Sequence, residues 1–249
     1  MLEAHNLRKS FGKLVATDDV SATFGETDGE MVFIVGPNGA GKTTFINLLT
    51  GLLTPDEGSV IVDGEEVTDM PAYKRVDRGL VRSFQVVSIF EEMSVRENLR
   101  TASLAHGKLT RNPIARSTSY DEIEAKVDSL LSRFQLDDVA ETVAEQLPHG
   151  DRKLLDVGMS FAMEPSYLLL DEPTSGVSAR ETENVIETIA TVSQEENVTT
   201  VTIEHDMDIV RGYADRVIAL HQGAIHGDGP PSMLETDDEL RRLLLGVSE

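Results

Sequence analysis

The sequence predicts an α/β fold built on a parallel sheet, and three observations support that class. Met31–Val35 and Tyr167–Leu170 are continuous apolar runs of strand length, as expected for parallel strands buried on both faces. Each run is followed along the chain by a segment with helical spacing of apolar residues, which gives the strand–helix alternation of such a sheet. Short alternating segments within residues 2–35, together with Ser59–Val67, predict a small antiparallel sheet beside this core.

The other elements are expected in chain order. Ser59–Val67 is typical of a hairpin because Asp63 and Gly64 suit its two-residue turn. Residues 94–147 have a helical pattern, and His106–Ser119 within them is polar enough to predict a loop. The remaining predicted elements are a strand over 80–85, a helix over 153–162, a strand over 167–170, a helix near 179–194, a strand over 199–203, a helix near 207–213 and a strand over 216–220.

Residues Gly36–Thr43 form a complete G-x-x-x-x-G-K-[ST] pattern between the predicted strand Met31–Val35 and a helix-like run. The glycines let the backbone wrap around an anion with its N–H groups inward, and the helix offers its positive end. Lys42 can reach the β- and γ-phosphates, and the Thr43 hydroxyl can bind Mg²⁺. The sequence therefore predicts a nucleoside triphosphate site formed by Gly36, Asn38, Gly39, Ala40, Gly41, Lys42, Thr43 and Thr44.

Two carboxylates, Asp171 and Glu172, end the predicted strand Tyr167–Leu170. The carboxyl ends of strands in α/β sheets line the crevice where ligands bind. Asp171 suits the Mg²⁺ shell, and Glu172 suits the group that orients or activates an attacking water. Taken alone the pair could be solvated acids at a strand end, but the phosphate loop favours the catalytic interpretation.

Composition excludes several classes of protein. The 44 acidic against 22 basic residues give a net charge of −22, which repels nucleic acids and anionic lipid, so no nucleic-acid partner is expected. The chain has no cysteine, no apolar run of ~20 residues and no export signal, so we expect a soluble intracellular protein. The acidic excess is dispersed and lysines are few, which favours a halophilic protein over an ordinary acidic one, since the Debye length is about 3 Å at 1 M salt.

Further residues in chain order resemble the ATPase subunits of ATP-binding-cassette (ABC) transporters over nearly the whole chain. Phe11 matches an aromatic residue that stacks on adenine, although a plain packing residue is the alternative. Gln85 matches a loop glutamine that touches Mg²⁺ and water, and His205 matches a histidine that contacts the γ-phosphate. Leu147–Asp151 occupies the signature position, where His149 and Gly150 would approach the nucleotide. The resemblance implies ATP and Mg²⁺ as cofactors, a metal shell from Thr43, Gln85 and Asp171, and hydrolysis by Lys42, Gln85, Glu172 and His205.

Within this family the chain most resembles the ATPase subunits of branched-chain amino-acid importers, with urea and amide importers next. The similarity rests on Ser83–Gln85, Phe90–Leu99, Ile203–Met207 and Leu243–Gly246. It implies a dimer with a second ATPase subunit, membrane permease subunits as partners, an extracytoplasmic solute-binding protein as an indirect partner, and a peripheral place on the inner face of the cell membrane. A soluble non-transport ABC ATPase and a weakly hydrolysing regulatory subunit are the alternatives.

The resemblance also implies the domain organisation. Residues 1–249 would form a single ABC ATPase domain with a P-loop core. That core, with its antiparallel β subdomain, would comprise 1–93 and 164–249, and the inserted helical subdomain with the signature would comprise 94–163.

Two departures from the family pattern lie in the signature. Pro148 stands where the family has a serine, so a hydroxyl donor to the γ-phosphate is missing. Asp151 replaces a glutamine and places a negative charge near phosphate. The loop Ser175–Ser178 lacks the aspartate that usually ends it. We therefore expect turnover that is slower than in relatives with the full signature.

Overall fold

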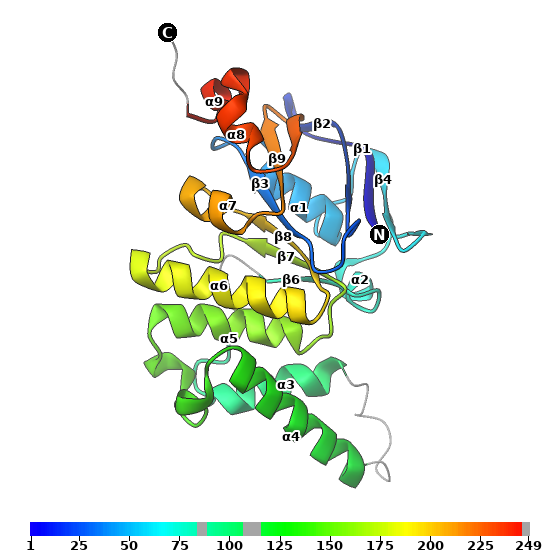
Figure 1. The fold of residues 1–249 in the computed structure, drawn as a ribbon. Coiled ribbons are helices and arrows are strands. Elements are labelled where there is room, and N and C mark those ends of the chain that lie inside the picture. Colours follow the sequence, from blue (N-terminus) through cyan, green and yellow to red (C-terminus); the bar gives the residue numbers. More distant parts are fainter. Residues whose placement is uncertain (84–88, 107–115, 246–249) are drawn as a thin grey trace. The chain divides into compact units, whose positions relative to one another are not determined.

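The computed structural model describes residues 1–83, 89–106 and 116–245, and the chain forms two compact units (Figure 1). Both units are assembled from segments that are separated in the sequence. The first comprises Met1–Arg82, Ser166–Pro173 and Ser193–Glu249, and the second comprises Ser83–Pro165 and Thr174–Val192. The division inferred above, with a helical subdomain over 94–163, stays a prediction.

The first unit contains a six-stranded sheet with the strand order β10-β9-β3-β8-β7-β6. All neighbouring pairs are parallel except β9 and β10, which form an antiparallel hairpin. The β3, β7 and β8 strands are buried along their whole length, so the continuous apolar runs of the sequence are explained by burial on both faces. The six strands are β3 (Met31–Val35), β6 (Leu80–Arg82), β7 (Tyr167–Asp171), β8 (Thr199–Ile203), β9 (Arg216–His221) and β10 (Ala224–Gly229).

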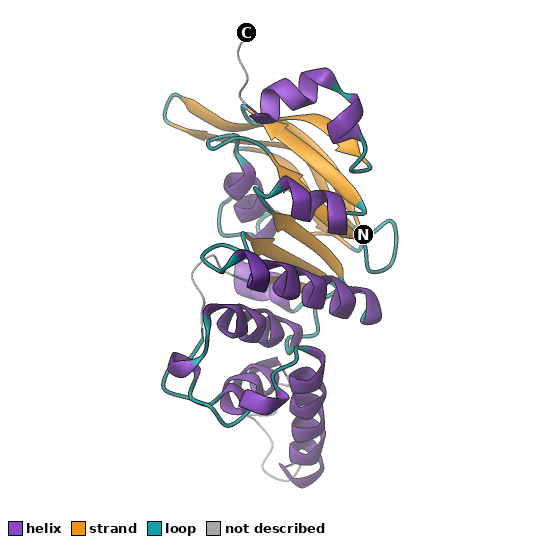
Figure 2. Cartoon of the chain, turned by 60° about the vertical axis from the view of Figure 1, so that its left-hand side comes forward, coloured by secondary structure: helices purple, strands orange, loops and turns teal. Residues whose placement is uncertain are grey.

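A second sheet of the same unit is entirely antiparallel, with the order β2-β1-β4-β5. Its strands are β1 (Leu2–Phe11), β2 (Leu14–Phe24), β4 (Glu57–Val62) and β5 (Glu65–Glu66). Every strand of the described residues belongs to the first unit, and Figure 2 shows these strands in orange.

The core of the first unit gathers side chains from both sheets around helix α1 (Lys42–Thr50). Phe45, Ile46, Leu48 and Leu49 of α1 are fully buried, and the Phe45 ring lies 6.3 Å from that of Phe24 on β2. Each buried side chain of this size contributes roughly 1.5–3 kcal/mol. This packing fixes the helix whose first turn carries Lys42 and Thr43.

A buried arginine donates hydrogen bonds to carbonyl groups at the carboxyl end of α1. Arg75, from the short helix α2 (Ala72–Val76), is 1% exposed and donates to the carbonyl oxygens of Leu48 and Leu49 at 2.9 and 2.6 Å. Its guanidinium also donates to the carbonyls of Thr68 and Met70. Burial lowers the pKa of Arg75 to about 10, so the side chain remains a cation at neutral pH beside the negative end of the helix.

The first unit ends with α7 (Met207–Tyr213), α8 (Met233–Thr236) and α9 (Asp238–Leu245). Asp206 begins α7 as its N-cap, because its carboxylate accepts from the backbone N–H groups of Asp208 and Ile209. Among the described residues, no helix is both long and apolar enough to cross a membrane.

The second unit is helical in its described part. Its elements are α3 (Val95–His106), α4 (Arg116–Arg133), two 3₁₀ turns (Asp137–Val139 and Ala144–Gln146), α5 (His149–Phe161) and the greater part of α6 (Ala179–Glu195). Its interior includes the rings of Phe134 and Phe161, whose centroids are 5.4 Å apart. Gly158 on α5 allows this contact, since a Cβ there would lie 3.3 Å from both Leu99 and Phe134.

The α/β class, the parallel sheet and the small antiparallel sheet are confirmed. The loop expected over His106–Ser119 is wrong at both ends, because α3 includes His106 and α4 begins at Arg116. Ser and Thr in the first turn of α4 produced that error, since they favour loops in a sequence pattern but also favour helix starts. The strand expected over 80–85 ends at Arg82, and residues 84 and 85 lie outside the described part.

Candidate functional site

The phosphate loop lies between β3 and α1, as the motif predicts. Gly41 is the residue before α1 and has a left-handed backbone with φ of 101°. The Nζ of Lys42 is buried and donates to the carbonyl oxygens of Gly36 and Pro37 at 2.6 and 3.1 Å. The ammonium group is therefore held over the backbone of the loop itself, at the positive end of α1.

The glycines of the loop are required for two different reasons. A Cβ on Gly41 would lie 2.2 Å from the carbonyl oxygen of Ala16 on β2, so the loop touches the neighbouring strand at that position. Gly39 also has a positive φ, 81°, but a Cβ there would meet nothing within 4 Å. Close approach therefore requires glycine at position 41, whereas conformation alone favours it at position 39.

The two predicted carboxylates have different environments. Asp171 ends β7, is 4% exposed and pairs with Arg82, whose Nη2 lies 3.0 Å from its Oδ2. Burial raises the pKa of Asp171, while the positive charge of Arg82 opposes that shift. Glu172 is more exposed and adopts a left-handed backbone with φ of 52°, which is uncommon for a residue with a side chain and is found at functional sites.

His205 contacts Glu172 directly, with 3.0 Å between its Nε2 and the Oε1 of the glutamate. It follows β8 and immediately precedes the N-cap Asp206 of α7, so the strand end and the helix start fix its backbone. The Glu172 backbone N–H donates to the carbonyl of Ile203 at 3.2 Å, which joins the ends of β7 and β8. The structure thus brings together two of the four side chains for which catalytic roles were predicted, Glu172 and His205.

Lys42 is electrostatically coupled to both acids. Burial lowers the pKa of its ammonium group, and the charges of Glu172 and Asp171 act in the opposite direction. The two carboxylates next to Lys42 repel a negatively charged ligand. Such a ligand therefore binds favourably beside Lys42 only when it also brings a cation.

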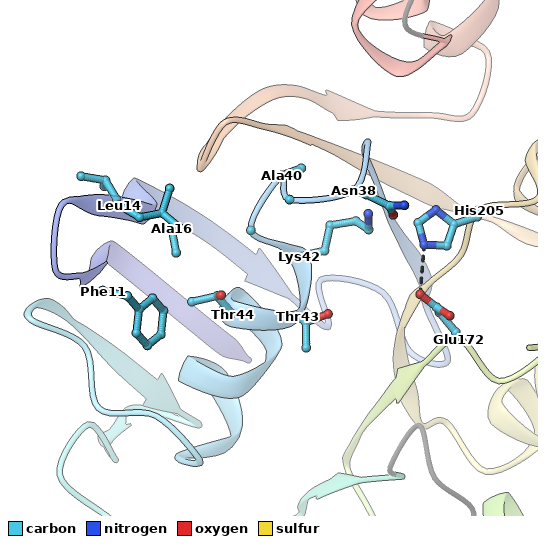
Figure 3. A pocket seen from close by; sticks show the side chains of 13 residues that line it. Phe11, Leu14, Ala16, Asn38, Ala40, Lys42, Thr43, Thr44, Glu172 and His205 are labelled. Carbon is cyan, nitrogen blue, oxygen red and sulfur yellow. Dashed lines mark hydrogen bonds and ion pairs between the residues drawn. The ribbon is translucent and has the colours of Figure 1, made fainter.

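A hollow of about 270 Å³ lies at the phosphate loop and is lined by Lys42 and Glu172 but not by Asp171 (Figure 3). Phe11, Leu14 and Ala16 lie on one side of the phosphate loop, and Glu172 with His205 lies on the other. Phe11 is 48% exposed, so it is not a core residue, and an exposed aromatic face can stack on a base. Its stacking on adenine stays a prediction. The hollow is lined by Phe11, Leu14, Val15, Ala16, Asn38, Gly39, Ala40, Gly41, Lys42, Thr43, Thr44, Glu172 and His205.

The donor set fits a metal that is shared with a ligand. No cluster of three or more His, Asp or Glu able to hold a metal occurs in the described part of the chain. Mg²⁺ in nucleotide sites is bound through one or two carboxylates together with phosphate oxygens, not by an all-protein cage. The Thr43 hydroxyl and the buried Asp171 carboxylate therefore fit Mg²⁺ that arrives with a nucleotide. Gln85, the third predicted ligand, lies outside the described residues.

The signature segment belongs to the second unit. Pro148 is the N-cap residue of α5 and offers no side-chain hydrogen bond to it, as expected from the missing hydroxyl. His149 is exposed and Gly150 is buried. The backbone N–H of Gly150 donates to the carboxylate of Glu181 on α6, which sequence reasoning had not singled out.

The carboxylate of Glu181 accepts hydrogen bonds from backbone N–H groups at the amino ends of two helices, α5 and α6. Its carboxylate accepts from the backbone N–H of Ser178 at 3.1 Å, in the arrangement of a capping box, and from the Ser178 hydroxyl. Asp151 lies near Glu181, and burial together with the negative charge of Glu181 raises the pKa of Asp151. The amino end of α5 is therefore acidic on both sides of Gly150.

Comparison with known proteins gives the family. The family model described as ABC transporter matches residues 18–175. The high-affinity branched-chain amino acid transport ATP-binding protein BraF of Pseudomonas aeruginosa is 34% identical over 252 residues, which cover 99% of this chain and 98% of BraF. LivG of Escherichia coli K12, with the same description, is 32% identical at the same coverage. The solved ADP conformation of an ATP-binding cassette from an ABC transporter is 28% identical over 99% of each chain, with a TM-score of 0.85.

A phosphate loop on a buried parallel sheet, with an acid pair and a histidine at the neighbouring strand ends, defines a nucleotide-hydrolysing subunit. The chain belongs to the ABC transporter family, as an ATP-binding subunit with ATPase activity. The solved cassette that resembles this chain is described in its ADP conformation. The fold inferred from the sequence and the family resemblance are confirmed.

Proposed function

We propose that this chain is the ATP-hydrolysing subunit of an importer for branched-chain amino acids or a related small solute. One observation carries the hydrolytic part, namely the contact between Glu172 and His205 beside the phosphate loop. The substrate class rests on the relatives, which match this chain over almost their full length. The ATPase itself contributes no contact to the solute, so family likeness is what supports that part of the proposal.

In this proposal each predicted site residue has a defined role. Lys42 neutralises the β- and γ-phosphate oxygens, and Phe11 stacks on the adenine. Glu172 orients and activates the attacking water, while His205 holds the Glu172 carboxylate and contacts the γ-phosphate. Thr43, Asp171 and Gln85 would hold Mg²⁺, which supplies neutralisation of the phosphate charge.

The proposed working form is a dimer of two such subunits with membrane permease subunits. One chain carries one phosphate loop and one signature, and His149 and Gly150 would face the nucleotide of the partner subunit. The dimer would lie in the cytoplasm against the inner face of the membrane, bound through the permease. The solute-binding protein on the other side would be only an indirect partner.

Two other functions would use the same site. A soluble ABC ATPase outside transport is disfavoured, because the relatives that match over full length are transport subunits. A regulatory subunit without useful hydrolysis is disfavoured by Glu172, which is present and contacts His205. The signature departures Pro148 and Asp151 predict slow turnover, not its loss.

The hydrolytic part is tested with the variant Lys42→Ala. We expect loss of tight ATP binding and of turnover, because the charge on the phosphate oxygens is no longer neutralised. Lys74→Ala is the matched control, since it removes the same charge from an exposed position. Turnover by Lys42→Ala equal to that of the control would refute the assignment of the site.

The substrate class is tested in cells that carry the gene. Deletion should abolish ATP-dependent uptake of radiolabelled leucine, isoleucine or valine, and the intact gene should restore it while a Lys42→Ala copy should not. Unchanged uptake of these amino acids, with loss of urea or amide uptake, would move the substrate to the related class. Loss of none of them would overturn the importer assignment.

We also propose that the protein is adapted to high salt. The net charge of −22 is spread over the sequence, and self-repulsion of this size destabilises the compact state in dilute buffer. Salt at molar concentration screens that repulsion beyond about 3 Å.

A further inference from the structure

Arg82 lies where the phosphate loop helix and the metal carboxylate meet, although no motif includes it. It is the last residue of β6, the strand next to β7 in the parallel sheet. One guanidinium nitrogen, Nη2, lies 3.0 Å from Oδ2 of Asp171, and the other, Nη1, donates to Oδ1 of Asn47 on α1. A single side chain therefore connects the end of β7 with the helix that begins at the phosphate loop.

The pair is buried to a degree that is rare for charged groups. The side chains of Arg82 and Asp171 are 9% and 2% exposed. Removing two charges from water costs several kcal/mol per ion, and their attraction repays this only with good geometry. Such a pair is weak as a stabilising device, so its position at the carboxylate proposed for Mg²⁺ requires another explanation.

We propose that Arg82 is a positioning residue for the metal-binding carboxylate of Asp171. This inference rests on the proposed function, in which Asp171 holds Mg²⁺ together with the nucleotide. The planar guanidinium of Arg82 hydrogen-bonds to both Asn47 and Asp171 and so fixes the orientation of the Asp171 carboxylate. Its positive charge already interacts with this carboxylate before a metal ion binds.

The two effects of Arg82 have opposite signs for metal binding and for turnover. A guanidinium and Mg²⁺ that share one carboxylate repel each other, so Arg82 weakens the binding of Mg²⁺. Fixed orientation of the carboxylate places the metal correctly for hydrolysis, so Arg82 raises kcat. A residue with a merely structural role would not separate these two quantities.

The experiment compares Arg82→Met, Arg82→Lys and Asn47→Ala with the wild-type chain. Binding of a fluorescent ADP analogue is measured while Mg²⁺ is titrated, and kcat is measured at saturating Mg²⁺ and ATP. Arg78→Met is the control, because Arg78 is an exposed arginine nearby in sequence that pairs with Glu65. Thermal unfolding in EDTA shows that each variant folds.

We expect Arg82→Met to lower the Mg²⁺ concentration for half-maximal binding by about threefold or more, as expected when a unit charge a few ångströms away is removed even in water. Its kcat should fall by about 10–100-fold, the usual effect of losing a group that orients a metal ligand. Arg82→Lys should keep the wild-type Mg²⁺ midpoint because the positive charge remains. It should not keep the wild-type kcat, because lysine lacks the planar guanidinium that bonds to two acceptors. Asn47→Ala should lower kcat without raising the midpoint.

A Mg²⁺ midpoint in Arg82→Met that is unchanged or higher would overturn the inference. If Arg82→Met does not fold, wild-type kcat in both Arg82→Lys and Asn47→Ala would overturn it equally. The proposed function fails in a different way, through full turnover by Lys42→Ala. An inactive Lys42→Ala with an Arg82→Met that behaves like Arg78→Met would refute only the role of Arg82.

Discussion

Gly41→Ala is the substitution whose cost the geometry of the phosphate loop determines most directly. The backbone of Gly41 has φ of 101°, and a Cβ would lie 2.2 Å from the carbonyl oxygen of Ala16 and 3.5 Å from Gly223 Cα. Gly223 is held from both sides, because its N–H donates to the Ala40 carbonyl and its carbonyl accepts from the Asp18 N–H. The methyl group therefore has no space without a shift of backbone.

Gly39→Ala is the matched control. It allows the loss of folding free energy in Gly41→Ala to be divided into a cost of backbone conformation and a cost of overpacking. Both positions have positive φ, which costs an alanine about 1–2 kcal/mol of folding free energy. Only Gly41 adds overpacking, which typically costs a further 1–3 kcal/mol or so. We expect the free energy of unfolding to fall by about 1–2 kcal/mol in Gly39→Ala and about 2–5 kcal/mol in Gly41→Ala.

The assay is urea unfolding of the nucleotide-free chain, supported by melting curves. The difference of about 1–3 kcal/mol between the two variants corresponds to several degrees in Tm, at about 2–4 °C per kcal/mol for a chain of this size. Gly41→Ala should also bind the ADP analogue less tightly, because the contact lies in the loop. Equal destabilisation by the two variants would refute the reasoning from close approach.

Three further predictions concern the acids. Glu172→Gln should bind ATP and form an ATP-bound dimer on sedimentation while hydrolysis falls by about 10²–10⁴-fold, and normal hydrolysis would remove Glu172 from its role. Asp151→Asn should raise Tm at pH 7–8: the folded-state pKa of Asp151 lies above the ordinary 3.8, so its ionised form costs stability at higher pH, and the gain should vanish as pH falls to that ordinary value. Melting temperature and ATPase activity should both rise as KCl enters the molar range, and a flat or falling melting temperature would contradict the halophilic proposal.

The parts of the fold and site that local patterns determine could be predicted from the sequence. The phosphate loop needs glycine at fixed spacing between a buried strand and a helix, so Lys42 and Thr43 were found by pattern alone. Asp171 and Glu172 were found because they end a continuous apolar strand. His205 was found by family resemblance, and its contact with Glu172 was not predicted, since 33 residues separate them and no local pattern relates them.

The parts that depend on distant partners could not be predicted. The side chains of Arg75 and Arg82 are largely shielded from solvent and their acceptors lie on other elements, and an arginine in a sequence gives no sign of burial. Glu181 is recognisable as the end of a capping box, S-x-x-E, but its second contact, with Gly150, depends on the packing of α6 in the second unit. The positive φ of Glu172 likewise follows from the join between β7 and β8.

The strand order of the central sheet has a consequence for synthesis on the ribosome. β3 lies between β8 and β9, so the strand that leads into the phosphate loop acquires its neighbours only after residue 221 has been made. Until then at least one edge of β3 is unpaired, and an unpaired strand edge favours aggregation. A nascent chain stopped at Arg82 would carry the whole nucleotide motif and the antiparallel sheet but neither of the strands that pair with β3. The nascent chain should therefore acquire nucleotide binding late and in a single step, when β8 and β9 have both been made.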